Sequence, residues 1–183
     1  MIRLQGQLVV LRAFDPSELD RVVEVREHDP TLPRTPRSQL LRRLERSGRL
    51  VRGRLDLAIE ADSELVGEVD ARQPANALPP GVFELGIVLY DAGRRGRGYG
   101  SEAVELLTNH LFANEGAERV QGSTALGNGP MRRVFTKLGF AEEGVMRGFM
   151  PAGDRREDYA LYGVTKEEWR QRDGGLVNRR VSD

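Results

Sequence analysis

The chain places the stretch Gly93-Arg94-Arg95-Gly96-Arg97-Gly98-Tyr99-Gly100-Ser101 between an apolar run at 82–90 and an amphipathic segment that begins at Glu102. These three patterns predict a strand, a glycine-rich turn and a helix N-terminus, in that order. Glycines let the backbone approach a ligand closely, so that several N–H groups point to one place. The helix dipole and the arginines add positive potential there. The turn therefore predicts an anion site, with a phosphate as the expected ligand.

Two common phosphate motifs do not fit this turn. A P-loop requires Lys and then Ser or Thr after its second glycine, whereas Tyr99 and Gly100 follow Gly98. A dinucleotide-binding turn requires a third glycine where this chain has Ser101. It also requires an acid at the end of the next strand, and Glu118 lies at the start of that strand. These mismatches argue against both classes of nucleotide site.

Outward from the turn, hydrophobic periodicity predicts a mixed sheet with helices. Apolar runs and alternation predict strands, and apolar stripes at helical spacing bounded by Pro or Gly predict helices. The predicted strands are 8–12, 55–60, 65–69, 82–90, 119–124, 140–146 and 159–164; the predicted helices are 16–26, 37–49, 98–115 and 128–137; and 74–81 and 150–158 are predicted loops. This order predicts one α+β (mixed α/β) domain at 1–172, followed by a flexible tail at 173–183.

Composition excludes several other classes of protein. The chain has no cysteine and two histidines, which leaves no disulfide or thiolate nucleophile and little room for a metal site, so no metal is expected. Its formal net charge of zero argues against a general nucleic-acid binder. No apolar stretch approaches the length of a membrane span, and the first residues do not resemble a signal peptide. We therefore expect a cytoplasmic protein that binds neither membranes nor nucleic acid.

The positive charge is concentrated in one segment. Between residues 34 and 54 there are eight arginines and a single acid, Glu45. A solvated helix face explains such a run most simply, and a site for an acidic partner is the alternative that remains open.

Two motifs together carry a resemblance to a known family. The segment Arg95-Gly96-Arg97-Gly98-Tyr99-Gly100 matches the pattern Arg/Gln-x-x-Gly-x-Gly/Ala, and Asn128-Gly129-Pro130-Met131 continues to Lys137-Leu138-Gly139-Phe140 and Glu143-Gly144. In this combination the chain resembles the GNAT acyl-CoA N-acyltransferase superfamily, and especially its Rim-type branch, which acetylates ribosomal-protein N-termini. Residues 8–12 and 158–169 are also similar to that branch.

The resemblance implies a fold and a ligand. The fold would be a mostly antiparallel, twisted sheet of about six to seven strands with one splayed strand pair, flanked by about four helices. Acetyl-CoA would be the co-substrate, with its pyrophosphate on the backbone of the glycine turn and its pantetheine arm along the preceding strand. The residues implied in cofactor binding are Val88, Leu89, Tyr90, Arg95, Gly96, Arg97, Gly98, Tyr99, Gly100, Ser101, Asn128, Met131 and Arg133. Met131 replaces the family's usual Ser, so a proton donor to the leaving thiolate is lost at this position.

The implied reaction is direct attack by a neutral amine on the thioester. Glu84 is the first candidate for the general base because it lies on the strand before the turn, where it would be partly buried, and Glu68 on the preceding strand is the second. Deprotonation through water is a third option. Tyr90, Tyr159 and Tyr162 are candidate acids for the thiolate.

Two kinds of acceptor amine fit the resemblance, and the sequence does not choose between them. A Rim-type enzyme would acetylate a protein N-terminus, and a small-molecule enzyme would modify an antibiotic or an amino acid. The helix pair at 16–49 and the loop at 150–158 are expected to form the acceptor site. A non-catalytic acyl-CoA sensor or nucleic-acid-associated module is the alternative from another class, favoured only by Met131. An exposed strand edge near the C-terminus could pair two subunits into a homodimer.

Overall fold

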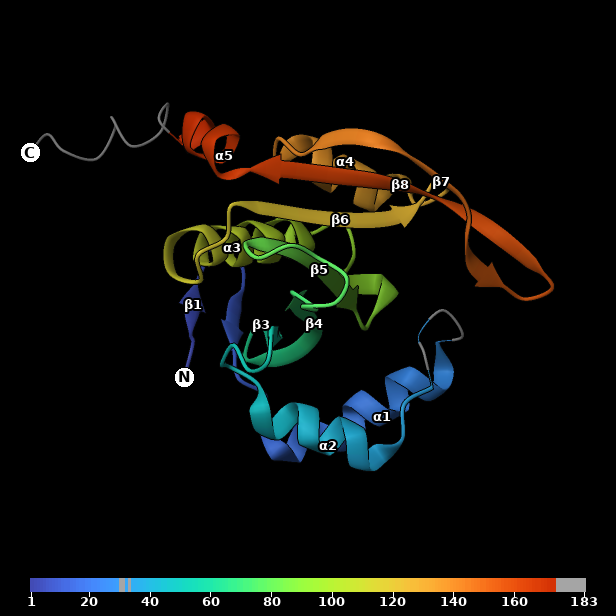
Figure 1. The fold of residues 1–183 in the computed structure, drawn as a ribbon. Helices are drawn as coiled ribbons and strands as arrows, with labels where there is room; N and C mark the ends of the chain where they lie inside the picture. The colour runs from blue at the N-terminus through green and yellow to red at the C-terminus, as the bar shows by residue number, and fades with distance from the viewer. Residues whose placement is uncertain (30–31, 33, 174–183) are drawn as a thin grey trace, which may run out of the picture.

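The computed structural model describes residues 1–29, 32 and 34–173. Within these residues eight strands form one sheet in the order β1-β2-β3-β4-β5-β6-β8-β7 (Figure 1). The strands are β1 (Leu4–Gln5), β2 (Val10–Arg12), β3 (Arg54–Ala61), β4 (Glu64–Arg72), β5 (Val82–Leu89), β6 (Arg119–Ala125), β7 (Ala141–Ala152) and β8 (Arg155–Thr165). Every neighbouring pair is antiparallel except β5 and β6, which are parallel.

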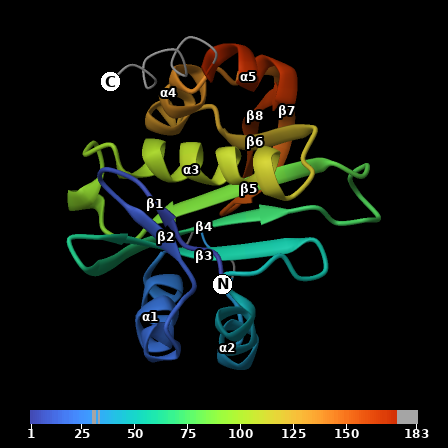
Figure 2. The same ribbon diagram turned by 90° about the vertical axis from the view of Figure 1, so that its left-hand side faces the viewer.

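Helices cover both faces of the sheet. The described part of the chain forms α1 (Leu19–His28), α2 (Arg37–Arg46), α3 (Tyr99–Asn114), α4 (Gly129–Lys137) and α5 (Lys166–Asp173), with short 3-10 turns at Pro16–Glu18 and Ala92–Arg94. The pair α1 and α2 lies on one side of strands β2 to β5, and α3 lies on the other (Figure 2). The α3 side holds the main hydrophobic core, whose fully buried members include Leu57, Val69, Leu107 and Leu111.

Alternation along β3 shows how the sheet separates two environments. Leu55, Leu57 and Ile59 belong to the main core on the α3 side. The residues between them point to the opposite face, where Ala58 joins the small apolar cluster under α1 and α2. Asp56 lies on that same face, is buried, and accepts hydrogen bonds from arginines. The face under α1 and α2 is therefore partly polar, although it is largely shielded from solvent.

The predicted α+β fold is confirmed, with two additional elements. The hairpin predicted from 55–60 and 65–69 is the β3–β4 pair. The two-residue strand β1 and the helix α5 were not predicted. Strand β1 is too short to show a period, and it forms because Gln5 pairs with Val10. Helix α5 docks through Trp169, which is 3% exposed and contacts the rings of Phe112 and Phe140.

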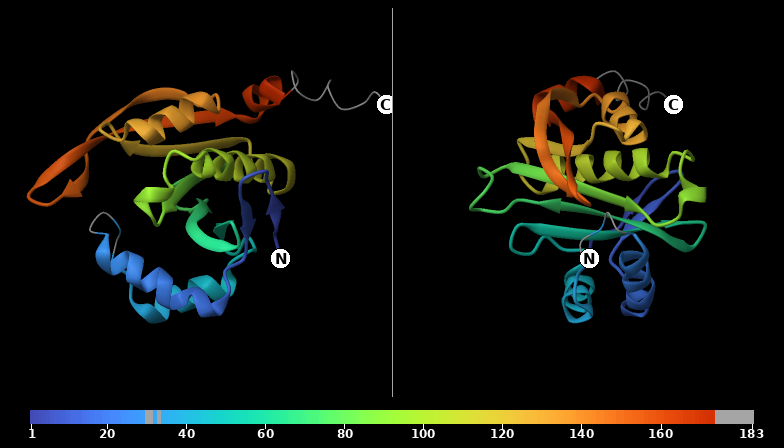
Figure 3. Two further views of the ribbon diagram at one scale, coloured as in Figure 1. Left: turned by 180° about the vertical axis from the view of Figure 1, so that it is seen from behind. Right: turned by 90° about the vertical axis from the view of Figure 1, so that its right-hand side faces the viewer.

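The predicted loop at 150–158 is wrong. Strand β7 continues to Ala152 and β8 begins at Arg155, so a two-residue turn with Gly153 at φ +67° joins them. The strands pair through this region, as in Met150 opposite Glu157. The hairpin extends past the rest of the sheet and is exposed on both faces here, so its sequence lacks the alternation of a half-buried strand (Figure 3).

Three other expectations stay predictions. The flexible tail at 173–183 lies outside the described residues except for Asp173, the last residue of α5. In the part of the chain that is described, no helix is both long enough and apolar enough to cross a membrane. The edge strand near the C-terminus is β7, with Val145 and Phe149 exposed, and it is the edge at which a second subunit is expected.

Candidate functional site

The glycine turn leaves the N-terminus of α3 open to a ligand. Gly98 is the N-cap residue at φ +89°, a conformation that favours glycine, and it offers no side chain to the first N–H groups of the helix. The first bond of the helix runs from the N–H of Glu102 to the carbonyl of Gly98, so the N–H groups of residues 99–101 lie outside the helix's own bonding. Gly96, at φ +79°, has open space where a side chain would be. This geometry fits an anion such as a pyrophosphate.

The arginines of the turn differ in their surroundings. Arg94 forms an ion pair with Glu64. Arg95 and Arg97 are exposed, and neither forms an ion pair with any described residue. These two side chains are therefore free to contact an anion seated on the turn.

Strands β5 and β6 separate after a short parallel contact. They pair only from Val82 to Glu84 on β5, after which β5 continues beside β4 and β6 beside β8. Phe135 of α4 lies at the point of separation. Its ring is so close to Gly122 of β6 that a side chain there would approach the ring to 2.6 Å. The ring of Phe135 thus packs on Gly122 beside the place where the strands separate, and the splayed pair implied by the resemblance is present.

Backbone direction along β5 determines which groups face the opening. The N–H of Tyr90 donates to the carbonyl of Val66 at 3.0 Å, so it faces β4. Because N–H groups alternate along an antiparallel strand, the N–H of Val88 also faces β4, whereas those of Ile87 and Leu89 face the edge from which β6 has separated. Of the three residues predicted to present a backbone donor, Leu89 is the one whose N–H points to the opening.

One cleft of about 810 Å³ runs through this opening. Val104 of α3 lines it on one side of the sheet, and Arg26 of α1 and Arg43 of α2 line it on the other. Phe149 and Tyr159 of the β7–β8 hairpin close it from the far end. The helix pair at 16–49 therefore borders a cleft that is continuous with the strand opening, and of the segment 150–158, also expected at the acceptor site, Met150 lines it.

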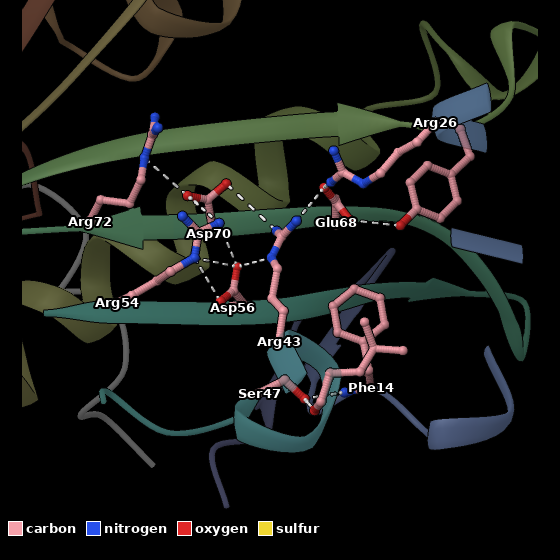
Figure 4. Close-up of polar contacts among 11 residues, drawn as sticks. Phe14, Arg26, Arg43, Ser47, Arg54, Asp56, Glu68, Asp70 and Arg72 are labelled. Carbon is pink, nitrogen blue, oxygen red and sulfur yellow. Dashed lines mark hydrogen bonds and ion pairs between the residues drawn. The ribbon is translucent and has the colours of Figure 1, made fainter. Parts of the chain in front are cut away.

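The residues of an ion-pair network line this cleft, and Figure 4 shows their contacts. Glu68 of β4 is 3% exposed and pairs with Arg26 and Arg43. The guanidinium of Arg43 also donates to Asp56 at 2.5 Å, and Arg54 donates to the same carboxylate at 2.9 Å. The hydroxyl of Tyr90 donates to Glu68 at 2.9 Å, and burial together with this carboxylate raises the pKa of Tyr90. Tyr90 therefore remains protonated at neutral pH.

The predicted catalytic carboxylates occupy different positions. Glu84 lies where β5 and β6 separate, with a side chain 37% exposed, and it accepts a hydrogen bond from Arg72 at 3.0 Å. Glu68 is buried within the network described above. Both line the cleft. Of the tyrosines proposed as acids, Tyr159 lines the cleft, whereas the hydroxyl of Tyr162 donates to Glu142 at 2.5 Å outside it.

The second motif lies across the opening from β5. Asn128 caps α4 by accepting the N–H of Met131 at 3.2 Å, and its amide donates to Thr124 of β6 at 3.0 Å. Asn128 and Met131 both line the cleft, whereas Arg133 is exposed and lies outside its lining. The predicted cofactor residues therefore lie on both sides of the strand opening and at the N-terminus of α3.

Sequence reasoning missed Asp70 and Phe135 as cleft residues. A signal for Asp70 was present, because Glu68, Asp70 and Arg72 alternate along β4 and so share one face. No signal for Phe135 was available, because its role depends on the packing of α4 against Gly122.

Comparison with known proteins identifies the family. Residues 9–141 match the family described as "Acetyltransferase (GNAT) domain". An uncharacterized N-acetyltransferase of Bacillus licheniformis, p20, is 30% identical over 82 residues, which are 44% of this chain and 46% of p20. The chain spans about half the length of the curated relatives it matches.

Solved structures share the fold at lower identity. RimJ of Mycobacterium smegmatis, in complex with a CoA-disulfide, superposes with a TM-score of 0.75 at 20% identity, over 96% of this chain and 93% of RimJ. The spermidine/spermine N-acetyltransferase SpeG of Vibrio cholerae superposes with a TM-score of 0.75 at 15% identity, over 92% and 99% of the two chains. Such identities show the fold alone.

Proposed function

Since the chain belongs to the acetyltransferase (GNAT) family, we propose that it transfers the acetyl group of acetyl-CoA directly to a primary amine. The observation that carries this proposal is the cleft that passes through the opening between β5 and β6. A donor on the α3 side and an acceptor on the α1–α2 side would meet at this opening. No covalent enzyme intermediate is needed, because the thioester is already activated.

The turn and the opening suit the parts of acetyl-CoA. Its pyrophosphate would bind the N–H groups at the start of α3, with Arg95 and Arg97 beside it. Its pantetheine arm would follow β5 past Val88 and the N–H of Leu89, opposite Asn128 and Met131. The N–H of Leu89 is the backbone donor positioned to polarise the thioester carbonyl.

The reaction then moves two protons. The bound ammonium gives one proton to a base in the cleft, and the neutral nitrogen forms a bond to the thioester carbon. The C–S bond breaks, and the thiolate of CoA leaves with the electron pair. The nitrogen loses its second proton, which neutralises the thiolate, and the products are an amide and free CoA. Glu84 and Glu68 stay the candidate bases predicted from the sequence.

For the acceptor we propose the N-terminal amine of a protein or peptide, as in the Rim-type branch. The charge of the cleft supports this choice, because its lining contains six arginines and four acids: Arg26, Arg42, Arg43, Arg46, Arg54 and Arg72 against Asp56, Glu68, Asp70 and Glu84. This excess of arginine disfavours a polyamine, which carries several positive charges. A peptide or an amino acid offers a carboxylate or an amide to the same groups, so a small amine with a carboxylate is the second candidate.

Release of free thiol from acetyl-CoA with a panel of peptides, amino acids and polyamines tests this proposal. We expect turnover with amines that carry carboxylates. The double substitution Arg95→Gln/Arg97→Gln should weaken acetyl-CoA binding about 10- to 100-fold in calorimetry, because two charge-assisted contacts are lost. Arg94→Gln is the matched control, since Arg94 is already paired with Glu64. Binding without turnover for any amine would favour the sensor, and no binding by the wild type would refute the proposal.

A further inference from the structure

Asp70 extends over the edge of β5 from the neighbouring strand. It lies on β4 opposite Gly86 of β5 and Asp56 of β3. Because Gly86 has no side chain, the carboxylate of Asp70 occupies the space above it, with Oδ1 2.7 Å from the place of a Cβ atom. Gly86 also lines the cleft where β5 has separated from β6. The carboxylate of Asp70 is thereby brought next to the opening.

The bonding of Asp70 is incomplete. Its Oδ2 atom is buried and has no hydrogen-bond partner among the described residues. The nearest cations are Nε of Arg72 at 3.2 Å and Nη2 of Arg54 at 3.5 Å from Oδ2, and Nη2 of Arg43 at 4.0 Å from Oδ1. Glu68, by contrast, accepts hydrogen bonds on both of its oxygens, from Arg26, Arg43 and Tyr90. The Oδ1 atom, with Arg43 4.0 Å away, also receives no hydrogen bond from the described residues, so Asp70 keeps an oxygen beside Gly86 that can accept a proton.

Charged groups face Asp70 from all the surrounding elements. They are Arg43 on α2, Arg54 and Asp56 on β3, Glu68 and Arg72 on β4, and Glu84 on β5. Burial raises the pKa of Asp70, and the negative charge of Asp56 raises it further, whereas Arg54, Arg72 and Arg43 act in the opposite direction. The pKa of Asp70 lies above its ordinary value as a result. Such a carboxylate accepts a proton more readily than an exposed one.

We infer that Asp70 is the general base that takes the proton from the acceptor's ammonium group at the opening between β5 and β6. This inference rests on the proposed acetyl transfer. The proton moves from the ammonium nitrogen to Oδ1 of Asp70, the oxygen that lies above Gly86 at the cleft, and the neutral amine then forms the bond to the thioester carbon. After the thiolate has left, Asp70 returns its proton to solvent and is ready for the next cycle.

The dependence of kcat on pH tests this assignment, measured with two amines of different basicity. In the wild type kcat should fall at low pH, and this acid limb should lie at the same pH with both amines, because the group that titrates is on the enzyme and not on the amine. Asp70→Asn should lose this limb and lower kcat about 10²- to 10⁴-fold, while acetyl-CoA binding measured by calorimetry remains. An unchanged profile in Asp70→Asn would overturn the inference but leave the acetyltransferase proposal intact. A wild type without turnover would refute that proposal, and this inference with it.

Substitutions of two residues beside Asp70 test the assignment by the direction in which each should move the acid limb of kcat. Asp56→Asn removes a negative charge that raises the pKa of Asp70, so the acid limb should move to lower pH. Arg54→Gln removes the positive charge that lowers the pKa of Asp70 most, so the limb should move to higher pH. A purely structural role for the network would not move the limb in opposite directions. If Asp70→Asn does not fold, an acid limb that stays at the wild-type pH in both Asp56→Asn and Arg54→Gln overturns the assignment. An acid limb that is lost only in Glu84→Gln also overturns it.

Discussion

Glu102 joins the N-terminal turn of the chain to the glycine turn. Its Oε2 atom accepts the N–H groups of Leu8 and Val9, both at 2.7 Å, and its Oε1 atom accepts that of Gln7 at 2.8 Å. The side chain of Leu8 lies against Gly98, with Cδ1 2.9 Å from the place of a Cβ atom. Loss of the carboxylate would release residues 7–9 and disturb the neighbouring glycine turn.

The cost of Glu102→Ala follows from which donors lose their partner. Water can reach the N–H groups of Gln7 and Leu8, which belong to exposed positions, but Val9 is only 2% exposed. An unsatisfied buried donor costs about 1–3 kcal/mol, and losing the charged acceptor of two exposed donors adds about 1 kcal/mol. We therefore expect a loss of about 2–4 kcal/mol. Glu102→Gln keeps one oxygen for Leu8 and Val9, so about 1 kcal/mol is expected.

Urea denaturation measures this loss in the free energy of unfolding, and thermal scanning measures the accompanying change in Tm. A domain of this size loses about 2–4 °C in Tm per kcal/mol, so Glu102→Ala should melt about 4–16 °C below the wild type. Glu105→Ala is the control, because Glu105 is on the same helix and forms an ion pair with Arg172 while 39% exposed, which is worth about 0–1 kcal/mol. Equal melting temperatures for the Ala variants of Glu102 and Glu105 would refute this reasoning.

Two further predictions concern the strand opening and helix α5. Gly122→Ala should cost about 1–3 kcal/mol in urea denaturation because its methyl group would meet the ring of Phe135, whereas Gly127→Ala, with open space around it, should be within about 0.5 kcal/mol of the wild type; equal costs would contradict this. Hydrogen bonds from the N–H and hydroxyl of Thr165, each 2.8 Å, hold the pKa of Glu168 below its ordinary value of 4.5. Stability from a lowered pKa is present above the unfolded value and lost as the pH falls through the folded one, so Glu168→Gln should melt below the wild type at pH 7 and lose this difference below pH 4.5; a difference that is constant with pH would contradict it.

The hairpin β7–β8 shows where reasoning from periodicity fails. Its distal half, including Met150 and Glu157, is exposed on both faces, so no alternation of apolar and polar residues marks it as strand. The β3–β4 hairpin was predicted correctly because apolar Leu55, Leu57 and Ile59 face the main core, while the polar side chains of Asp56 and Glu60 lie on the opposite face. Periodicity thus reports a difference in polarity between the two faces of a strand, and it identifies a strand only where the faces differ.

The glycine turn at 93–101 could be read from the sequence alone, because positive φ angles at Gly96 and Gly98 and a helix N-terminus are local properties. The splayed strands were implied by the resemblance, but the contact of the Phe135 ring with Gly122 beside them depends on how α4 packs. The ion-pair network of the cleft was not predictable, since Arg26, Arg43 and Asp70 come from three elements far apart in the chain. Alternation shows that a side chain faces a given side of a sheet, whereas strand register and helix packing decide which charges it meets there. The sequence thus determined the glycine turn of this protein, and the tertiary structure determined which carboxylates lie at the strand opening and which arginines they meet.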